Sequence, residues 1–311
     1  MLANSAVAES FVWPKKTLFD DTHDNFWEHM MDRIVYVNGE YLPETQATVS
    51  IFDRGLLFAD AVYEVSAILD GRLLDNEAHL ARLARSLDEL EMESPVSPTE
   101  IIEIQKTLIE RNQVKEGMVY LQISRGVADR EFALPAGTAP TLFMFTQARA
   151  VRNNPKAKSG MSVVTVPDIR WARRDIKTVG LLGPVLAVRA AKQAGADDAW
   201  MVEDGFVTEC SASNAYIVSD ENTIITRHLG SEILHGITRV AMLRLSKELD
   251  IALEERPFSV AEALRASEAF ITGASSIVIP VVSIDGQPIG DGTPGPVSSK
   301  LRELYLEQAL Q

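Results

Sequence analysis

The 311-residue sequence contains one cysteine, Cys210, and few basic residues for its length. One cysteine cannot form an intramolecular disulfide, and no Cys/His spacing typical of a structural metal site surrounds it. Lysine and arginine together number 30 against 44 acidic residues, which gives a formal net charge of -14, and no dense Lys/Arg cluster occurs. Because nucleic acids are bound by basic patches, we expect no nucleic-acid partner. The lack of Cys/His ligand spacing around Cys210 leads us to expect no bound metal either.

Long hydrophobic runs are also lacking. No stretch reaches the ~18 uninterrupted apolar residues of a membrane-spanning helix. The N-terminus lacks the basic segment and apolar core of a secretory signal peptide. These absences, together with the cysteine content, predict a cytoplasmic protein that does not bind membranes. The length exceeds the usual size of a single hydrophobic core, so two domains are expected.

Changes in composition along the chain suggest three parts. Residues 1–31 look like an N-terminal extension with a short amphipathic helix. Residues 32–150 are expected to form a small α/β domain, and residues 151–311 a larger domain. The polar stretch at 149–160 contains proline and glycine and is the best candidate for the linker between the two domains.

Short strands and separate helices alternate in both expected domains. The dipeptides Asn38-Gly39 and Asp70-Gly71 each lie between apolar runs, which is a hairpin signal. Apolar residues recur at helical spacing in the stretches 76–92, 97–114, 184–195, 237–250 and 259–268. Strands are expected at 47–52, 117–126, 139–148, 161–169, 198–209, 214–227 and 269–289. This mixture of hairpins and segregated helices predicts an α+β, or mixed α/β, fold.

Four local features carry possible chemistry. Lys177 precedes a small, apolar, glycine-broken run. Glu209 ends a strand and enters a loop of small residues. Ile237 and Thr238 begin a helix, whose first N–H groups lack partners in the helix and can bind an anion. The loop at 273–276, which includes Ser275, offers further N–H and hydroxyl donors.

An amine, an acid and an anion cradle are the three requirements of pyridoxal 5′-phosphate. The amine forms an imine with the cofactor aldehyde, the acid keeps the pyridine nitrogen protonated, and the cradle holds the phosphate. Each feature alone has a plainer interpretation. A lysine beside an apolar run is more often a surface group, and Glu209 alone would be a solvated loop acid. Their combination and order favour the cofactor.

The motifs DIKTVGLLGPVLA, VTECSASN, ILHGITR and TGASSIVIPVVSIDG resemble those of the class IV aminotransferases of pyridoxal-phosphate fold type IV. The resemblance runs from about Ile34 to the C-terminus. It implies a two-domain fold with the active site between the domains and near the interface of a homodimer. It also implies that Lys177 is the lysine that binds the cofactor covalently, and that Glu209 is the partner of the pyridine nitrogen.

The same resemblance extends to the first domain. Arg82 matches the phosphate-binding arginine of the family, while His79 on the same expected helix is better explained as a packed or capping histidine. Within the family, the stretches LLFADAVYEV and YLQISRGVADREFALP are most similar to the D-amino-acid transaminases. In those enzymes a tyrosine, an arginine and a histidine hold the substrate α-carboxylate. Tyr63 and Arg130 match the first two, but Phe132 stands at the histidine position.

The resemblance therefore implies transfer of an amino group between a D-amino acid and a 2-oxo acid. Phe132 makes the pocket less polar, which keeps open an (R)-selective amine transaminase or mixed specificity; a structural role of Phe132 as a loop anchor is the alternative. Branched-chain L-amino-acid transamination, a lyase of the same family and a non-catalytic pyridoxal-phosphate-binding protein are further alternatives.

Overall fold

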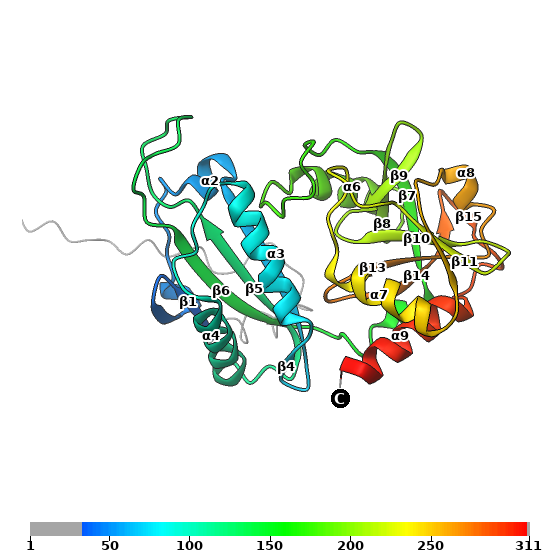
Figure 1. Ribbon diagram of the computed structural model, residues 1–311, viewed down its shortest axis with the longest axis horizontal. Helices are drawn as coiled ribbons and strands as arrows, with labels where there is room; N and C mark the ends of the chain where they lie inside the picture. The colour runs from blue at the N-terminus through cyan, green and yellow to red at the C-terminus, as the bar shows by residue number, and fades with distance from the viewer. Residues whose placement is uncertain (1–32, 310–311) are drawn as a thin grey trace, which may run out of the picture.

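The computed structural model describes residues 33–309, which form two halves built around separate β-sheets that lie side by side (Figure 1). The expected N-terminal extension, residues 1–31, lies outside the described residues. Figure 1 shows one connecting segment between the halves, which follows the last strand of the first sheet. Within residues 33–309, no helix has the length and apolar character needed to cross a bilayer.

The first half contains a six-stranded antiparallel sheet. In spatial order its strands are β2 (Glu40–Pro43), β1 (Ile34–Val37), β6 (Thr141–Ala148), β5 (Glu116–Ser124), β3 (Ala61–Leu69) and β4 (Arg72–Leu73). Helices α3 (Asn76–Glu89) and α4 (Pro98–Arg111) bury their apolar faces against this sheet in one continuous core. The short η2 (Glu44–Gln46) and α2 (Arg54–Phe58) lie in the connection between β2 and β3.

Local sequence signals explain the boundaries of these elements. Asn38 and Gly39 both adopt positive φ angles, 47° and 101°, as a two-residue hairpin turn requires. Asp70 and Gly71 repeat this geometry with φ angles of 52° and 74°. Ser97 begins α4 with a capping box, in which its hydroxyl accepts from the Glu100 amide and the Glu100 carboxylate accepts from the Ser97 amide.

The second half contains a nine-stranded mixed sheet. Eight strands follow the order β12 (Ala252–Glu255), β11 (Thr223–Thr226), β10 (Asn214–Val218), β13 (Glu268–Gly273), β14 (Ile277–Ile284), β7 (Met161–Pro167), β8 (Asp198–Glu203) and β9 (Phe206–Cys210), and β15 (Gln287–Pro288) pairs with β14. Helix α6 (Leu182–Gln193) packs on β7 and β8. Helix α7 (Ile237–Glu248) packs against β12, β13 and α9 (Pro296–Ala309), and α9 packs against β13 and β14. The predicted α+β class is confirmed.

Several local predictions differ from the structure. The stretch 47–52 is an irregular segment that ends in a turn at 51–52 and not a strand, because Val49 and Ile51 are exposed at 47% and 71% and are not covered by an apolar layer. The linker stretch contains a short helix, α5 (Pro155–Ser159), and the helix expected at 259–268 shrinks to α8 (Val260–Ala263). The sequence analysis did not identify α9 or β12, whose apolar periodicity is weak.

Candidate active site

A cavity of about 460 Å³ lies between the two halves. Its walls come from β3 and α3 of the first half, and from the β7–α6 connection, the β9–β10 loop, the start of α7 and the β13–β14 loop of the second. Seven of the nine residues that the sequence singled out line it: Tyr63, Arg82, Lys177, Glu209, Ile237, Thr238 and Ser275. Segments far apart in the sequence are therefore brought to one site.

Lys177 lies in the β7–α6 connection, which is held against the first sheet by backbone contacts. The Lys177 carbonyl accepts from the Tyr63 amide at 3.0 Å, and its amide donates to Ser86 Oγ at 3.3 Å. The side chain is half-buried, with Nζ 4.0 Å from the centroid of the Tyr63 ring. Among residues 33–309 no carboxylate forms an ion pair with it, so the amine faces the cavity without a charged partner.

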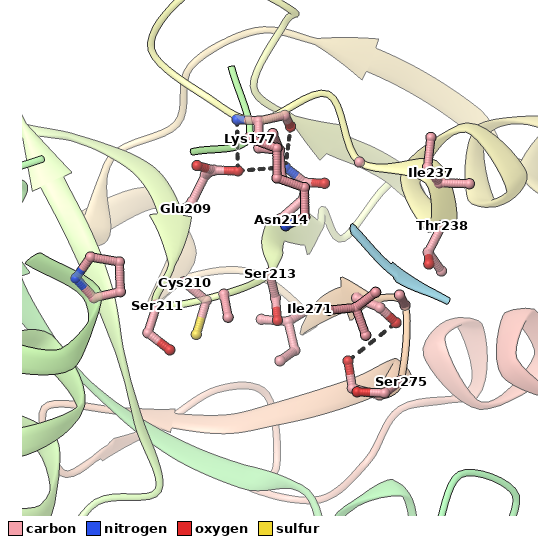
Figure 2. Close-up of a pocket in the computed structure, with 18 of the residues that line it drawn as sticks. Lys177, Glu209, Cys210, Ser211, Ser213, Asn214, Ile237, Thr238, Ile271 and Ser275 are labelled. Carbon is pink, nitrogen blue, oxygen red and sulfur yellow. Dashed lines mark hydrogen bonds between the residues drawn. The ribbon is translucent and has the colours of Figure 1, made fainter. Parts of the chain in front are cut away.

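Glu209 lies at the end of β9 and is 3% exposed. Its Oε1 accepts from Asn214 Nδ2 at 2.8 Å and from the Leu234 amide at 3.0 Å, and its Oε2 accepts from Arg170 Nη1. Figure 2 shows Lys177, Glu209 and Asn214 at one end of the pocket. Burial raises the pKa of Glu209, and the Arg170 guanidinium opposes this shift by favouring the carboxylate.

The sequence analysis missed Asn214 and Arg170. Asn214 is the last residue of the VTECSASN motif, five positions after Glu209, so the motif itself carried the signal. Arg170 is held by Asp168, with 2.6 Å between Nη2 and Oδ2. If Glu209 is buried, it needs a nearby cation as its counter-ion, so a cationic partner could have been expected from the sequence. The sequence contains many arginines, however, and no local pattern identifies Arg170 as that partner.

The opposite end of the pocket contains the expected anion donors Ile237, Thr238 and Ser275 (Figure 2). Helix α7 is 12 residues long and its N-cap residue, Gly236, offers no side-chain cap, so the first amides of the helix remain available. A side chain at Gly236 would displace Asn214, because a Cβ at this position would lie 1.9 Å from Asn214 Oδ1. The loop that follows β13 brings Ser275 to the same end of the cavity.

Arg82 of α3 reaches this anion site from the first half. Its Nε and Nη2 donate to the two oxygens of the buried Glu64 at 2.7 and 2.8 Å, and its Nη1 donates to the His235 carbonyl at 2.8 Å. His79 Nδ1 lies 2.8 Å from the same carboxylate. Burial alone would raise the pKa of Glu64, but Arg82 and His79 outweigh it and lower the pKa to about 2. The sequence analysis did not identify Glu64.

Arg130 and Phe132 lie outside the residues that line this cavity. Both are exposed, Phe132 at 82%, in the segment between β5 and β6. The Arg130 guanidinium lies 5.5 Å from the centroid of the Phe58 ring and 5.9 Å from that of Phe132. Within one chain, Arg130 and Phe132 therefore lie beside each other and apart from the seven predicted site residues that line the cavity.

The order of these residues along the chain agrees with a known family. The family model described as amino-transferase class IV matches residues 61–284. The chain belongs to the class IV aminotransferases. The resemblance found in the sequence is thereby confirmed, and this aminotransferase uses pyridoxal 5′-phosphate as its cofactor, as the class does.

Individual relatives of this aminotransferase cover most of its length. The D-alanine aminotransferase of Bacillus licheniformis is 38% identical over 268 residues, which are 86% of this chain and 94% of that protein. The D-alanine aminotransferase of Staphylococcus aureus (strain MSSA476) is 36% identical over 270 residues, 86% of this chain and 95% of that protein. Among solved structures, the T.th. branched-chain amino acid aminotransferase with pyridoxamine 5′-phosphate superposes with a TM-score of 0.83 at 26% identity and covers 89% and 94% of the two chains.

The residues present fit the cofactor that this aminotransferase uses. The cavity lining contains an amine without a charged partner, a buried carboxylate and a helix start with available amides, which are the groups that an aldehyde, a ring nitrogen and a phosphate need. The cavity volume of about 460 Å³ is within the range of small-molecule sites. We therefore assign Lys177 and Glu209 to the ring end, and Arg82, Ile237, Thr238 and Ser275 to the phosphate end, as a proposal.

Proposed function

We propose that this aminotransferase moves an amino group between a D-amino acid, such as D-alanine or D-glutamate, and a 2-oxo acid. The observation that carries the proposal is the likeness to D-alanine aminotransferases, which are 36% and 38% identical over 86% of the chain. Lys177, Tyr63 and the acid Glu209 line one cavity, which agrees with an aminotransferase site. We also propose the cytoplasm as the location, in line with one cysteine that is buried and unpaired.

Each residue has a role that follows from its contacts. The bound cofactor supplies the carbonyl that takes up the amino group, and a ring that accepts the electron pair left when the substrate Cα loses its proton. Lys177 Nζ would hold the cofactor covalently and, once the substrate amine has displaced it, would be free to take the Cα proton. Of the two lysines that line the cavity, Lys156 is paired with Asp197 and, among residues 33–309, Lys177 has no carboxylate partner. Glu209 keeps a proton on the ring nitrogen, and Asn214, Leu234 and Arg170 fix its carboxylate for that role.

The α-carboxylate of the substrate needs a cation that is not already paired. Arg82 is bound to Glu64 and is assigned to the phosphate. The resemblance to the D-amino-acid transaminases implies Arg130 as the partner of the α-carboxylate. Since Arg130 lies outside its own cavity, we propose that it acts in the cavity of a second copy, within a homodimer. The exposed apolar side chains that share this end of the first half, including Val127, Phe132 and Leu134, suit such an interface.

Mixing two inactive variants tests the homodimer. Lys177→Ala leaves Arg130 intact, and Arg130→Ala leaves Lys177 intact. After the two proteins are unfolded and refolded together, mixed dimers contain one complete site, so amino-acid transamination should return to a substantial fraction of the wild-type rate. Activity that stays at the level of the separate variants would show that Arg130 serves its own chain or no site. Sedimentation of the wild-type protein as a monomer would contradict the homodimer directly.

Phe132 favours a second candidate, an (R)-selective amine transaminase or an enzyme of mixed specificity. Replacement of an imidazole by a phenyl ring removes a hydrogen-bond donor that only a carboxylate substrate needs. Rates with D-alanine, L-leucine and (R)-1-phenylethylamine, each with pyruvate and with 2-oxoglutarate as acceptor, distinguish the candidates. The proposal expects the highest kcat/KM with D-alanine and 2-oxoglutarate. A preference for L-leucine would overturn it in favour of a branched-chain enzyme.

A further inference from the structure

Arg302, on the C-terminal helix α9, is 7% exposed and has no role in the site described above. Its Nη1 donates to the carbonyls of Ser276 at 2.7 Å and Val278 at 2.9 Å. Its Nη2 donates to the carbonyl of Val151 and, at 3.3 Å, to that of Arg152. This buried cation has backbone carbonyls as partners, and none of its four bonds ends on a carboxylate.

The first two carbonyls flank Ile277, which has an unusual backbone conformation. Its φ angle is +63°, in the left-handed region that a β-branched residue rarely adopts. Ile277 pairs with Gly273 at the base of the β13–β14 hairpin, where glycine or asparagine would adopt this angle readily. The Ile277 side chain is fully buried in the same core cluster as Leu301 and Tyr305 of α9. Burial and the Arg302 bonds therefore both hold a strained residue in place.

The other two carbonyls belong to the segment that connects the two halves. The amides of Val151 and Arg152 donate to Oε1 of Glu116 on β5. The two residues are thus fixed from one side by a carboxylate of the first half and from the other by Arg302. Two residues earlier, Arg149 Nη1 donates to Ser275 Oγ at 3.1 Å. That bond uses a lone pair of the hydroxyl and leaves its hydrogen free for another acceptor in the cavity.

We propose that Arg302 is a positioning residue for cofactor binding. It holds the carbonyls on both sides of Ile277, which orients the 274–276 loop and its Ser275 hydroxyl toward the phosphate, and it ties that loop to the connecting segment 151–152. The inference rests on the proposed assignment of Ser275 to the phosphate end of the site. Without Arg302, the strained conformation of Ile277 relaxes and the loop donors turn away from the phosphate.

The test compares pyridoxal 5′-phosphate with pyridoxal, which has the same ring and aldehyde but no phosphate. The full chain, freed of cofactor, is titrated with each compound and the visible absorption is followed. For Arg302→Met we expect the Kd for pyridoxal 5′-phosphate to rise at least about tenfold, equivalent to about 1.4 kcal/mol, while the Kd for pyridoxal changes by less than about twofold. General damage to the fold would weaken both compounds alike and would overturn the inference.

Arg125→Met provides a control in the first half, away from the 274–276 loop. Arg125 is 9% exposed and also donates to two backbone carbonyls, those of Leu90 and Glu91. Unlike Arg302, it also pairs with a carboxylate, that of Asp60, so its replacement should disturb the fold at least as much. In the Arg125→Met variant, the ratio of the Kd for pyridoxal 5′-phosphate to the Kd for pyridoxal should equal that of the wild type. A change as large as that for Arg302→Met would mean that loss of any buried guanidinium has this effect, which contradicts the inference.

Two more variants make the test decisive. If Arg302→Met does not fold, Arg302→Lys keeps the charge but only one nitrogen, and should show a smaller rise in the same ratio. In an Ile277→Gly background the positive φ angle has no cost, so Arg302→Met should then change the ratio by less than about threefold. A full tenfold change in that background would overturn the link through Ile277.

If the wild type does not prefer pyridoxal 5′-phosphate over pyridoxal, the phosphate assignment is wrong and the inference falls with it. Amino transfer through Lys177 is tested separately, by the Lys177→Ala variant.

Discussion

The Nζ of Lys177 lies 4.0 Å from the centroid of the Tyr63 ring, and the Tyr63 amide donates to the Lys177 carbonyl at 3.0 Å. These two contacts join the second half of the molecule to the first sheet at the point where the amine enters the cavity. The position of the amine therefore depends on how the two halves meet, and the ring of Tyr63 favours a cation or a developing positive charge beside it.

Replacement of Lys177 by alanine should abolish amino transfer. The variant loses both the covalent attachment and the base for the Cα proton, so we expect kcat to fall at least about 10³-fold. Borohydride treatment should label Lys177 in the wild type, as mass spectrometry of peptides can show, and should label no lysine in the variant. Lys156→Ala is the control, because Lys156 lines the same cavity but pairs with Asp197 at 2.7 Å. Label on Lys156 in the wild type would remove Lys177 from this role.

The Glu209→Gln variant should still bind the cofactor but should catalyse amino transfer more slowly. A neutral amide cannot hold a proton on the ring nitrogen, so we expect the half-reaction with D-alanine to slow by about 10²- to 10⁴-fold. Stopped-flow absorption measures this step directly. Glu203→Gln serves as the control, since Glu203 on the neighbouring strand is partly exposed, pairs with Arg174 and is not among the residues that line the cavity. Equal half-reaction rates in wild type and Glu209→Gln would contradict the assignment.

Stability at low pH should depend on Glu64. Its folded-state pKa is lowered from 4.5 to about 2, so the carboxylate stabilises the fold above pH 4.5 and this contribution is lost as the pH falls from 4.5 toward 2. The loss corresponds to about 3 kcal/mol in the free energy of unfolding. Urea unfolding across this range should show a shallower pH dependence for Glu64→Gln than for the wild type. Parallel curves would mean that the ion pair with Arg82 adds no pH-dependent stability.

Phe132→His should improve amino-acid substrates at the expense of amines. The imidazole adds a donor beside Arg130, so we expect kcat/KM for D-glutamate to rise by at least about tenfold, which corresponds to the lower end of the ~1.5–3 kcal/mol of one hydrogen bond to a charged group. Activity on (R)-1-phenylethylamine should fall in the same variant.

Arg130→Ala should lower kcat/KM for D-amino acids relative to kcat/KM for amines, which is the opposite of the effect of Phe132→His. The reason is that the carboxylate of the amino acid uses the charge of Arg130 and the amine does not. The comparison is made between substrates within one variant, so that general damage to the fold cancels. If either substitution changes both substrates by the same factor, this segment does not contact the substrate carboxylate.

Local features of the sequence determined the secondary structure of much of the chain and the type of chemistry. Asn-Gly and Asp-Gly turns, a capping box and helical periodicity act over a few residues, so their outcome can be predicted without knowledge of packing. The motifs around Lys177 and Glu209, and the start of the helix at Ile237, likewise lie within short segments. This is why the α+β class and the family could be predicted.

Tertiary structure decided which groups complete the site. Arg82 contacts the carbonyl of His235, which is 153 positions away, and Arg302 contacts that of Val151, which is 151 positions away. No local pattern encodes such pairs, because they exist only after two sheets and a C-terminal helix have packed together. The same packing buries Glu64 and Glu209, and burial makes their hydrogen-bond partners indispensable. The placement of Arg130 outside its own cavity also follows from the fold, since its exposed segment runs between β5 and β6 at the far end of the first half.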